Sequence, residues 1–241
     1  MSALPNSLKE GLKAFTERRN YKSVALFWIG SFLVLNSVIS AVSINSFELG
    51  IIIPGNASSF LPAFLYYLTG IIGIIILIWN LVYTVKKNMA EELDTSPLLD
   101  NSFPVSNILA AELSLGVFYY LLYILFDIAN LLSFILVPLL AVYILAAVTY
   151  YPFIIIEKGE NFIKALRESF YETRGVLKKT DILVSYLILL VMQILLVWST
   201  VSITGTVFSH ITQIILAFTG AFIISFGVLS FTELYQSHRK S

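Results

Sequence analysis

The stretch that decides the fold covers residues 105–156 and reads VSNILAAELSLGVFYYLLYILFDIANLLSFILVPLLAVYILAAVTYYPFIII. A helix needs about 20 apolar residues to cross the hydrocarbon core of a membrane, so this stretch is too long for one span and long enough for two. Asp127 and Asn130 interrupt it near its middle. We therefore expect two spans joined by a tight hairpin, at 105–126 and 131–156; a re-entrant third segment is the alternative.

Four more apolar stretches of spanning length lie outside this pair. The chain has 241 residues, of which 58% are hydrophobic and 12% charged, whereas about a quarter of positions are charged in an ordinary soluble domain. Apolar runs of this length also exclude an outer-membrane barrel, whose strands are alternating segments of about ten residues. The sequence predicts an all-α, polytopic transmembrane bundle of six spans. Its membrane domain is expected over residues 24–232, with the other four spans at 24–44, 63–85, 181–203 and 210–231.

The basic residues are distributed unevenly, although Lys+Arg and Asp+Glu are equal at 15 each. Five precede the first expected span, two follow the second, six lie between the fourth and the fifth, and two lie in the tail. All of them fall on one side of a six-span arrangement, as the positive-inside rule requires of cytoplasmic segments. This agreement favours the hairpin over the re-entrant segment. We expect a multi-pass protein of the cell membrane with both termini in the cytoplasm, including a C-terminal tail at 233–241.

Residues 1–23 are expected to form a cytoplasmic amphipathic helix. Ser7 and Glu10 have the spacing of a capping box, which predicts that the helix starts at Leu8. An apolar stripe with basic side chains beside it favours a helix that rests on anionic headgroups, with docking on a partner as the alternative. The candidate lipid contacts in this segment are Lys9, Lys13, Arg18 and Arg19.

A second amphipathic helix is expected over residues 161–179, along the cytoplasmic surface of the membrane. Asn161 is placed to cap its first turn, and Gly159 breaks the chain just before it. Apolar residues then recur at helical spacing, while charged residues occupy the other faces. The candidate anionic-lipid contacts here are Arg167, Arg174, Lys178 and Lys179.

Three polar side chains lie well inside the expected spans, namely Glu112, Asn36 and Gln193. An ionisable group in hydrocarbon is costly and marks a candidate functional site. No basic residue occurs at the depth of Glu112 in another span. We therefore expect either hydrogen bonds to polar groups of the bundle or a proton or cation site. Asn36 and Gln193 are expected to join helices by hydrogen bonds, and Pro138 predicts a kink in the fourth span.

No pattern of residues predicts catalysis or cofactor binding. The chain has no cysteine, which excludes a disulfide framework, a thiolate metal site and a thiol nucleophile. We find no metal-ligand spacing and no nucleotide-binding motif, so we expect no enzyme activity, no cofactor and no nucleic-acid partner. One glycosylation sequon begins at Asn56, on the side opposite the basic segments.

One segment resembles a known family. It begins at Tyr150 as YYPFIIIEKG and continues with ALRESF at 165–170 and with Arg174 and Gly175. The pattern is similar to that of a six-span, archaeal-type membrane protein family of unknown function, which is related to the membrane domain of glycerophosphoryl diester phosphodiesterases. The remainder of the chain matches only in the arrangement of spans. The resemblance implies no chemistry, because the catalytic domain of those phosphodiesterases has no counterpart in this chain.

Two functions remain open from the sequence. The first is a non-catalytic membrane scaffold or accessory subunit that contacts the lipid bilayer, a membrane-protein partner or a second copy of itself. The second is a small transporter or lipid-handling protein that uses Glu112, with Asn36 and Gln193 along its path. An intramembrane enzyme is a weaker third possibility, because Glu112 has no evident catalytic partner at its depth. The basic segments and the lack of a catalytic pattern favour the first function.

Overall fold

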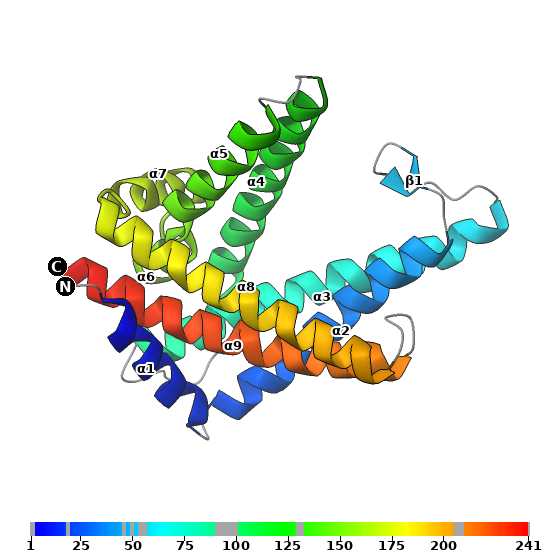
Figure 1. The fold of residues 1–241 in the computed structure, drawn as a ribbon, viewed down its shortest axis with the longest axis horizontal. Coiled ribbons are helices and arrows are strands. Elements are labelled where there is room, and N and C mark those ends of the chain that lie inside the picture. The colour runs from blue at the N-terminus through cyan, green and yellow to red at the C-terminus, as the bar shows by residue number, and fades with distance from the viewer. Residues whose placement is uncertain are drawn as a thin grey trace. The chain divides into compact units, whose positions relative to one another are not determined.

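The computed structural model describes residues 3–17, 20–44, 47–48, 51–52, 57–89, 101–128, 133–204 and 210–240 (Figure 1). The elements in chain order are α1 (Leu4–Thr16), α2 (Tyr21–Ile44), β1 (Phe47–Glu48), β2 (Ile51–Ile52), α3 (Ala57–Met89), α4 (Ser102–Ile128), α5 (Ser133–Val148), α6 (Tyr151–Lys158), α7 (Phe162–Glu172), α8 (Val176–Thr204) and α9 (His210–Lys240). The two short strands pair in antiparallel fashion, and the other elements are helices, as the sequence predicts.

Five of the described helical segments are long and apolar enough to cross a membrane. They are Tyr67–Met89, Ser102–Leu122, Leu140–Lys158, Val176–Ile203 and Ile211–Arg239. Each overlaps one of the expected spans, so the prediction of a helical membrane protein is confirmed at this level. The remaining expected span, 24–44, corresponds to helix α2, and its crossing of the membrane stays a prediction.

The expected span 131–156 consists of two helices rather than one. Helix α5 ends and α6 begins around a turn at Thr149 and Tyr150. Pro152 accounts for this position, because proline lacks a backbone N–H and is tolerated best in the first turn of a helix, where it lies in α6. Pro138, at which we expect a kink, lies inside α5, and the helix continues through it.

Helices α4 and α5 pack against each other, as expected for the two arms of a hairpin. The Tyr119 hydroxyl on α4 donates a hydrogen bond of 3.5 Å to the Ala141 carbonyl on α5. Of the expected hairpin turn, residues 127–130, the first two belong to the end of α4, and the other two lie outside the described residues. The helix pairing itself therefore agrees with two spans in this stretch.

Helix α7 is shorter than the helix expected at 161–179. Asn161 caps it as predicted, because its Oδ1 accepts a hydrogen bond of 3.0 Å from the Lys164 backbone N–H. The chain then turns at Gly175, whose φ of 126° is readily adopted only by glycine. Residues 176–179 consequently belong to α8, which starts five residues before Asp181, where we expect the fifth span to begin.

Helix α1 starts at Leu4, one turn earlier than the capping box predicts. Ser7 is not its cap, because the Ser7 hydroxyl donates to the carbonyls of Ala3 and Leu4 at 2.9 and 3.1 Å within the helix. The helix packs closely on α9. A Cβ atom added at Gly11 would lie 2.9 Å from the Ser230 Cα atom, so this contact requires a glycine.

The chain forms two compact units. Unit 1 comprises Met1–Lys13, Val82–Leu187 and Leu229–Ser241, and unit 2 comprises Ala14–Leu81 and Ile188–Val228. Helices α4, α5, α6 and α7 of unit 1 pack against one another. Helices α1, α3, α8 and α9 each contribute one part of their length to unit 1 and the other part to unit 2.

In unit 2, α2 and α3 approach each other through glycines. A Cβ atom at Gly30 would lie 3.1 Å from the Gly73 carbonyl oxygen, and a Cβ atom at Gly73 would lie 2.9 Å from the Gly30 carbonyl oxygen. Buried Asn80 of α3 donates its side-chain amide to the Ser23 carbonyl of α2 at 2.7 Å. Small residues thus bring the two backbones into contact, as in many membrane helix pairs.

Candidate functional site

The best-defined group of polar side chains in unit 1 surrounds the turn between α5 and α6. The Ser169 hydroxyl on α7 accepts a hydrogen bond from the Tyr150 N–H and donates one to the Ala147 carbonyl, both at 3.0 Å. The Thr173 hydroxyl donates to the same carbonyl at 3.0 Å. A buried backbone group without a partner is costly, so these two hydroxyl groups stabilise the break in the helix.

Tyr150 also begins a chain of buried hydrogen bonds that joins several helices. Its hydroxyl lies 2.6 Å from Nδ1 of His238 in α9, and Nε2 of His238 lies 3.2 Å from Oδ2 of Asp181 in α8. The same carboxylate oxygen accepts a hydrogen bond of 3.0 Å from the Ala3 N–H, just before α1. A carboxylate only accepts, so Nε2 carries the proton, and in the neutral ring Nδ1 accepts from the Tyr150 hydroxyl. We term Ala3, Tyr150, Asp181 and His238 the polar junction.

Aromatic rings and a lysine surround the polar junction. Tyr150 packs edge-on against Tyr235 and Phe153, with ring centroids 5.2 and 6.3 Å away, and the latter two rings stack on each other at 5.5 Å. Lys178 donates a hydrogen bond of 2.7 Å to the His238 carbonyl, which ties the start of α8 to the end of α9. Apolar packing and charge-assisted bonding therefore act together at this point.

A tyrosine hydroxyl, a histidine ring and a carboxylate that are hydrogen-bonded in this order can transfer a proton. The polar junction is closed to a substrate, because Tyr150, Asp181 and His238 are only 0%, 5% and 5% exposed. Among the described residues, no group of three or more histidine or acidic side chains could hold a metal ion. A fully bonded, buried network of this kind fixes the helices that contribute to it.

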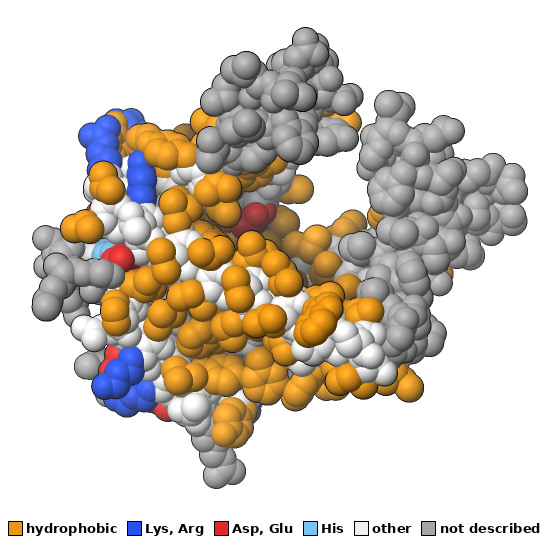
Figure 2. Space-filling view, viewed as in Figure 1, with side chains coloured by type: hydrophobic (Ala, Val, Ile, Leu, Met, Phe, Trp, Pro, Cys, Tyr) orange, Lys and Arg blue, Asp and Glu red, His pale blue; other side chains and the backbone are white. Residues whose placement is uncertain are grey.

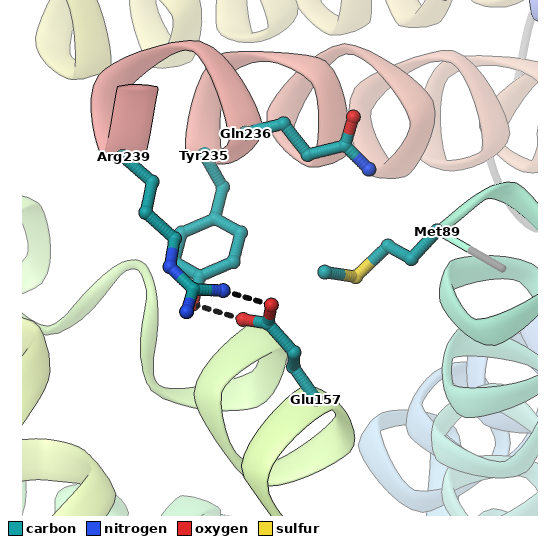
Figure 3. A pocket seen from close by; sticks show the side chains of 5 residues that line it. All are labelled: Met89, Glu157, Tyr235, Gln236 and Arg239. Atoms are coloured by element: carbon teal, nitrogen blue, oxygen red, sulfur yellow. Dashed lines mark hydrogen bonds and ion pairs between the residues drawn. The ribbon is translucent and has the colours of Figure 1, made fainter. Parts of the chain in front are cut away.

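A pocket of about 510 Å³ in unit 1 is lined by Met89, Glu157, Tyr235, Gln236 and Arg239 (Figure 3). Glu157, near the end of α6, accepts a hydrogen bond of 2.7 Å from the Tyr235 hydroxyl and forms an ion pair with Arg239. Figure 3 shows Glu157 directed toward these two residues of α9, with Met89 on the other side of the pocket. The two charges neutralise each other, so the pocket presents no net charge to a ligand.

Glu112 lies in α4, within the candidate span Ser102–Leu122. The Tyr151 hydroxyl, at the start of α6, donates a hydrogen bond of 2.5 Å to its Oε1. A hydrogen bond to a polar group of the bundle is one of the two possibilities that we expect for Glu112 from the sequence. Tyr151 is buried while Glu112 is exposed. The carboxyl group is therefore anchored on one side and open on the other.

Asn36 and Gln193 belong to unit 2 and do not form the hydrogen bonds between helices that we expect. Asn36 is half-buried and Gln193 is exposed, and neither side chain is bonded to another described residue. Gln193 does not bond to another helix because of its position: it lines a mainly apolar pocket of about 450 Å³, together with Ser31 and Gly220. The structure thus places Gln193 at a pocket rather than at a helix contact.

The expected lipid contacts of the N-terminal segment are described only in part. Lys9 and Lys13 are exposed on α1, and Lys13 forms an ion pair of 3.6 Å with Glu10. The other two candidate contacts of this segment, Arg18 and Arg19, and the glycosylation acceptor Asn56 lie outside the described residues.

The four expected lipid contacts around α7 divide into two groups. Lys178 is directed to the end of α9, where it bonds to the His238 carbonyl. The other three, Arg167, Arg174 and Lys179, contact aromatic rings. Lys178 is consequently removed from the set that can meet a lipid headgroup.

Sequence reasoning missed the polar junction. His238 and Tyr150 are 88 residues apart, and His238 and Asp181 are 57 apart, so no local pattern connects them. The hydrogen bonds at the turn between α5 and α6 could have been predicted from the sequence. Ser169 in α7 and Thr173, which directly follows α7, are four residues apart and therefore lie on the same side of a segment where we expect an apolar stripe.

No protein family, curated protein or solved structure matches the chain. The family resemblance therefore stays a prediction. Within the resembling segment, the structure gives a local role to two residues. Ser169 bonds the turn between α5 and α6, and Gly159 ends α6 with a φ of 64°.

Proposed function

We propose that the protein is a non-catalytic membrane scaffold or accessory subunit, placed in the cell membrane with both termini in the cytoplasm. Its partner is a transmembrane helix of another protein, which binds at the exposed face of α4. The single observation that carries this proposal is the exposed carboxyl group of Glu112 within a candidate span.

An exposed carboxyl group in a span favours a polar partner from outside the chain. An ionisable side chain in hydrocarbon is costly unless polar groups meet it. Tyr151 meets Oε1 of Glu112, whereas Oε2 has no hydrogen-bond donor among the described residues. A hydroxyl, amide or basic side chain on a neighbouring helix would supply the missing donor.

The surface of α4 around Glu112 suits the close approach of such a helix. Gly116 and Tyr120 follow Glu112 at four-residue spacing and are exposed, so the three residues share one face. A Cβ atom at Gly116 would meet nothing within 4 Å, which leaves room for another backbone. The neighbouring side chains of Leu113 and Val117 are 64% and 60% exposed and offer apolar contact area.

The test is to identify the helix beside α4 and to disrupt its contact. A photoreactive residue is placed at Val117, and the full-length protein is extracted with its surrounding lipids in native-membrane particles and analysed by mass spectrometry. We expect a one-to-one crosslinked partner. Gly116→Leu and Glu112→Leu are expected to abolish its co-purification, because one blocks the approach and the other removes the acceptor.

Ser202→Leu is the matched control, since it also adds an exposed leucine to a candidate span, in α8. It is expected to retain the partner. Retention of the partner by both α4 variants would contradict the proposal. A second copy of the chain crosslinked at Val117 would replace the accessory role with self-assembly.

A second candidate, a small transporter or lipid-handling protein, is favoured by the pocket of about 450 Å³ in unit 2. Its lining is mainly apolar, and Ser31 Oγ has no hydrogen-bond partner among the described residues there. Such a pocket fits an acyl chain with one polar group. This function would be favoured if mass spectrometry finds the protein without a protein partner but with one class of bound lipid. The variant Gln193→Leu would then be expected to lose that lipid. Loss of solute uptake in Glu112→Gln would favour a proton or cation role for Glu112.

A further inference from the structure

Helix α7 lies at the boundary of the candidate membrane-spanning region. The span Leu140–Lys158 ends just before it, and the span Val176–Ile203 begins just after it. Three apolar side chains at this position are strongly exposed, with exposed fractions of 67% for Ile163, 83% for Val176 and 67% for Leu177. Apolar side chains exposed at such a boundary are suited to insertion among acyl chains.

Three basic side chains on α7 and the start of α8 lie against aromatic rings. The guanidinium carbons of Arg174 and Arg167 lie 4.3 and 5.9 Å from the centroid of the Tyr171 ring. The Lys179 amine lies 3.9 Å from the Tyr143 ring centroid and 2.7 Å from the Tyr143 hydroxyl, to which it donates. Contacts of this kind orient long side chains and reduce the entropy lost when they bind an anion.

The same three side chains have no acidic partner in the part of the chain that the structure describes. No described carboxylate forms an ion pair with Arg167, Arg174 or Lys179. In contrast, Lys158 pairs with Glu168, and Lys164 pairs with Glu160. The basic group beside α7 thus keeps its positive charge available for an external anion.

The basic and apolar side chains are also neighbours on the surface. Figure 2 shows Lys and Arg side chains gathered over α7 and the start of α8, with hydrophobic side chains beside them. We propose that Arg167, Arg174 and Lys179 bind the phosphate headgroup of an anionic membrane lipid, whose acyl chains lie beside the exposed apolar residues. Guanidinium groups match the geometry of phosphate oxygens, and tyrosine is favoured at the membrane interface.

A lipid fits this site better than a soluble phosphate compound. The exposed side chains of Ile163, Val176 and Leu177 would be left in water if the ligand were a soluble anion. With a lipid, the cations meet the headgroup while these side chains meet hydrocarbon. The inference goes beyond the proposed partner contact, because α7 and the exposed face of α4 carry different residues.

The test compares two lipids that differ in headgroup charge. The purified full-length protein is titrated in detergent with phosphatidylglycerol and, separately, with phosphatidylcholine of the same acyl chains, and bound lipid is counted by native mass spectrometry. We expect a preference for phosphatidylglycerol, which the double variant Arg167→Gln/Arg174→Gln reduces about tenfold or more, since each surface cation contributes about 1 kcal/mol. Lys179→Gln is an independent variant and is expected to weaken the preference about fivefold.

Lys158→Gln/Lys164→Gln is the matched control, because it removes two positive charges from neighbouring positions that already have acidic partners. It is expected to keep the preference, and unchanged circular dichroism and thermal midpoints establish that the variants fold. An equal loss of preference in the control, or none in the arginine variant, would overturn the proposal. Displacement of the lipid by millimolar inorganic phosphate would assign the site to a soluble anion instead.

Discussion

Two helix contacts, one within unit 1 and one within unit 2, position their helices in different ways. In unit 1, directional bonds join distant helices, as in the chain from Tyr150 through His238 to Asp181. In unit 2, α2 and α3 meet where Gly30 and Gly73 bring their backbones together. The first contact depends on hydrogen bonds between single polar atoms, whereas the second depends on the small volume of the glycines. Apolar helices of the same kind can therefore be positioned by hydrogen bonds in one region and by close packing in another.

Unit 2 has a spectroscopic signal of its own in solution. The chain has three tryptophans, Trp28, Trp79 and Trp198, and all of them belong to unit 2. Tryptophan fluorescence consequently reports on unit 2, whereas helical circular dichroism reports on both units. A difference between the two signals during unfolding would show that the units lose structure at different temperatures.

The largest effect is expected from Asp181→Ala in unit 1. The change leaves the buried His238 N–H and the half-buried Ala3 N–H without their acceptor, which should cost about 3 kcal/mol. Unfolding in detergent followed by circular dichroism measures this loss. Glu10→Ala removes an exposed carboxylate of an ion pair and serves as the control, with an expected change below about 1 kcal/mol. Equal effects of the two changes would contradict the role of the polar junction.

Gly73→Ala should produce the next largest effect, and in unit 2. Its Cβ atom would lie 2.9 Å from the Gly30 carbonyl oxygen, and a backbone atom cannot move aside as a flexible side chain can. We expect a loss of about 2 kcal/mol, visible as a lower unfolding midpoint by tryptophan fluorescence.

The control for Gly73→Ala is Gly116→Ala. A Cβ atom at Gly116 meets nothing within 4 Å, so the same chemical change there adds no overlap. It should leave stability unchanged or raise it by up to about 1 kcal/mol, because alanine favours the helix. A comparable loss at Gly116 would show that helix packing is not the cause.

Ser169→Ala tests a polar contact of unit 1 whose loss should act locally, at the turn between α5 and α6. It removes the acceptor for the Tyr150 N–H and one of two donors to the Ala147 carbonyl, which should cost about 1.5 kcal/mol. Faster hydrogen exchange at the Tyr150 amide is the specific readout. Ser106→Ala, on an exposed part of α4, should change neither stability nor this exchange rate.

The smallest effect is expected at the start of α7. Asn161→Ala removes the side-chain cap of the Lys164 N–H and should cost about 1 kcal/mol, whereas Asn161→Ser should retain most of the stability. Unfolding by circular dichroism compares the two. If both variants lose the same amount, the cap does not stabilise α7.

The five candidate spans could be predicted because each depends on a local run of apolar residues. The Asn161 cap was also predictable, since its hydrogen bond reaches only three residues along the chain. The residues at which helices begin were harder to predict than the spans. The Ser7 prediction was wrong because the same spacing of Ser7 and Glu10 also fits inside a helix that begins earlier.

The polar junction could not be predicted for a related reason. Asp181 looks like the start of a span in the sequence, and His238 lies in a polar tail, so neither has a local pattern that reveals its partner. Only the packing of α8 on α9 brings them within 3.2 Å. The partner of Glu112 was foreseeable in type but not in identity, because Tyr151 follows a turn that the expected continuous span did not contain.

The turn between α5 and α6 has a consequence for biosynthesis. The hydroxyl groups that complete its hydrogen bonds lie 19 to 26 residues later in the chain. At about 5–20 residues per second, the ribosome needs roughly one to five seconds to supply them after Tyr150. During that interval, the Ala147 carbonyl and the Tyr150 N–H need water or the insertion machinery as partners. We therefore expect helices α5, α6 and α7 to leave that machinery together rather than one helix at a time.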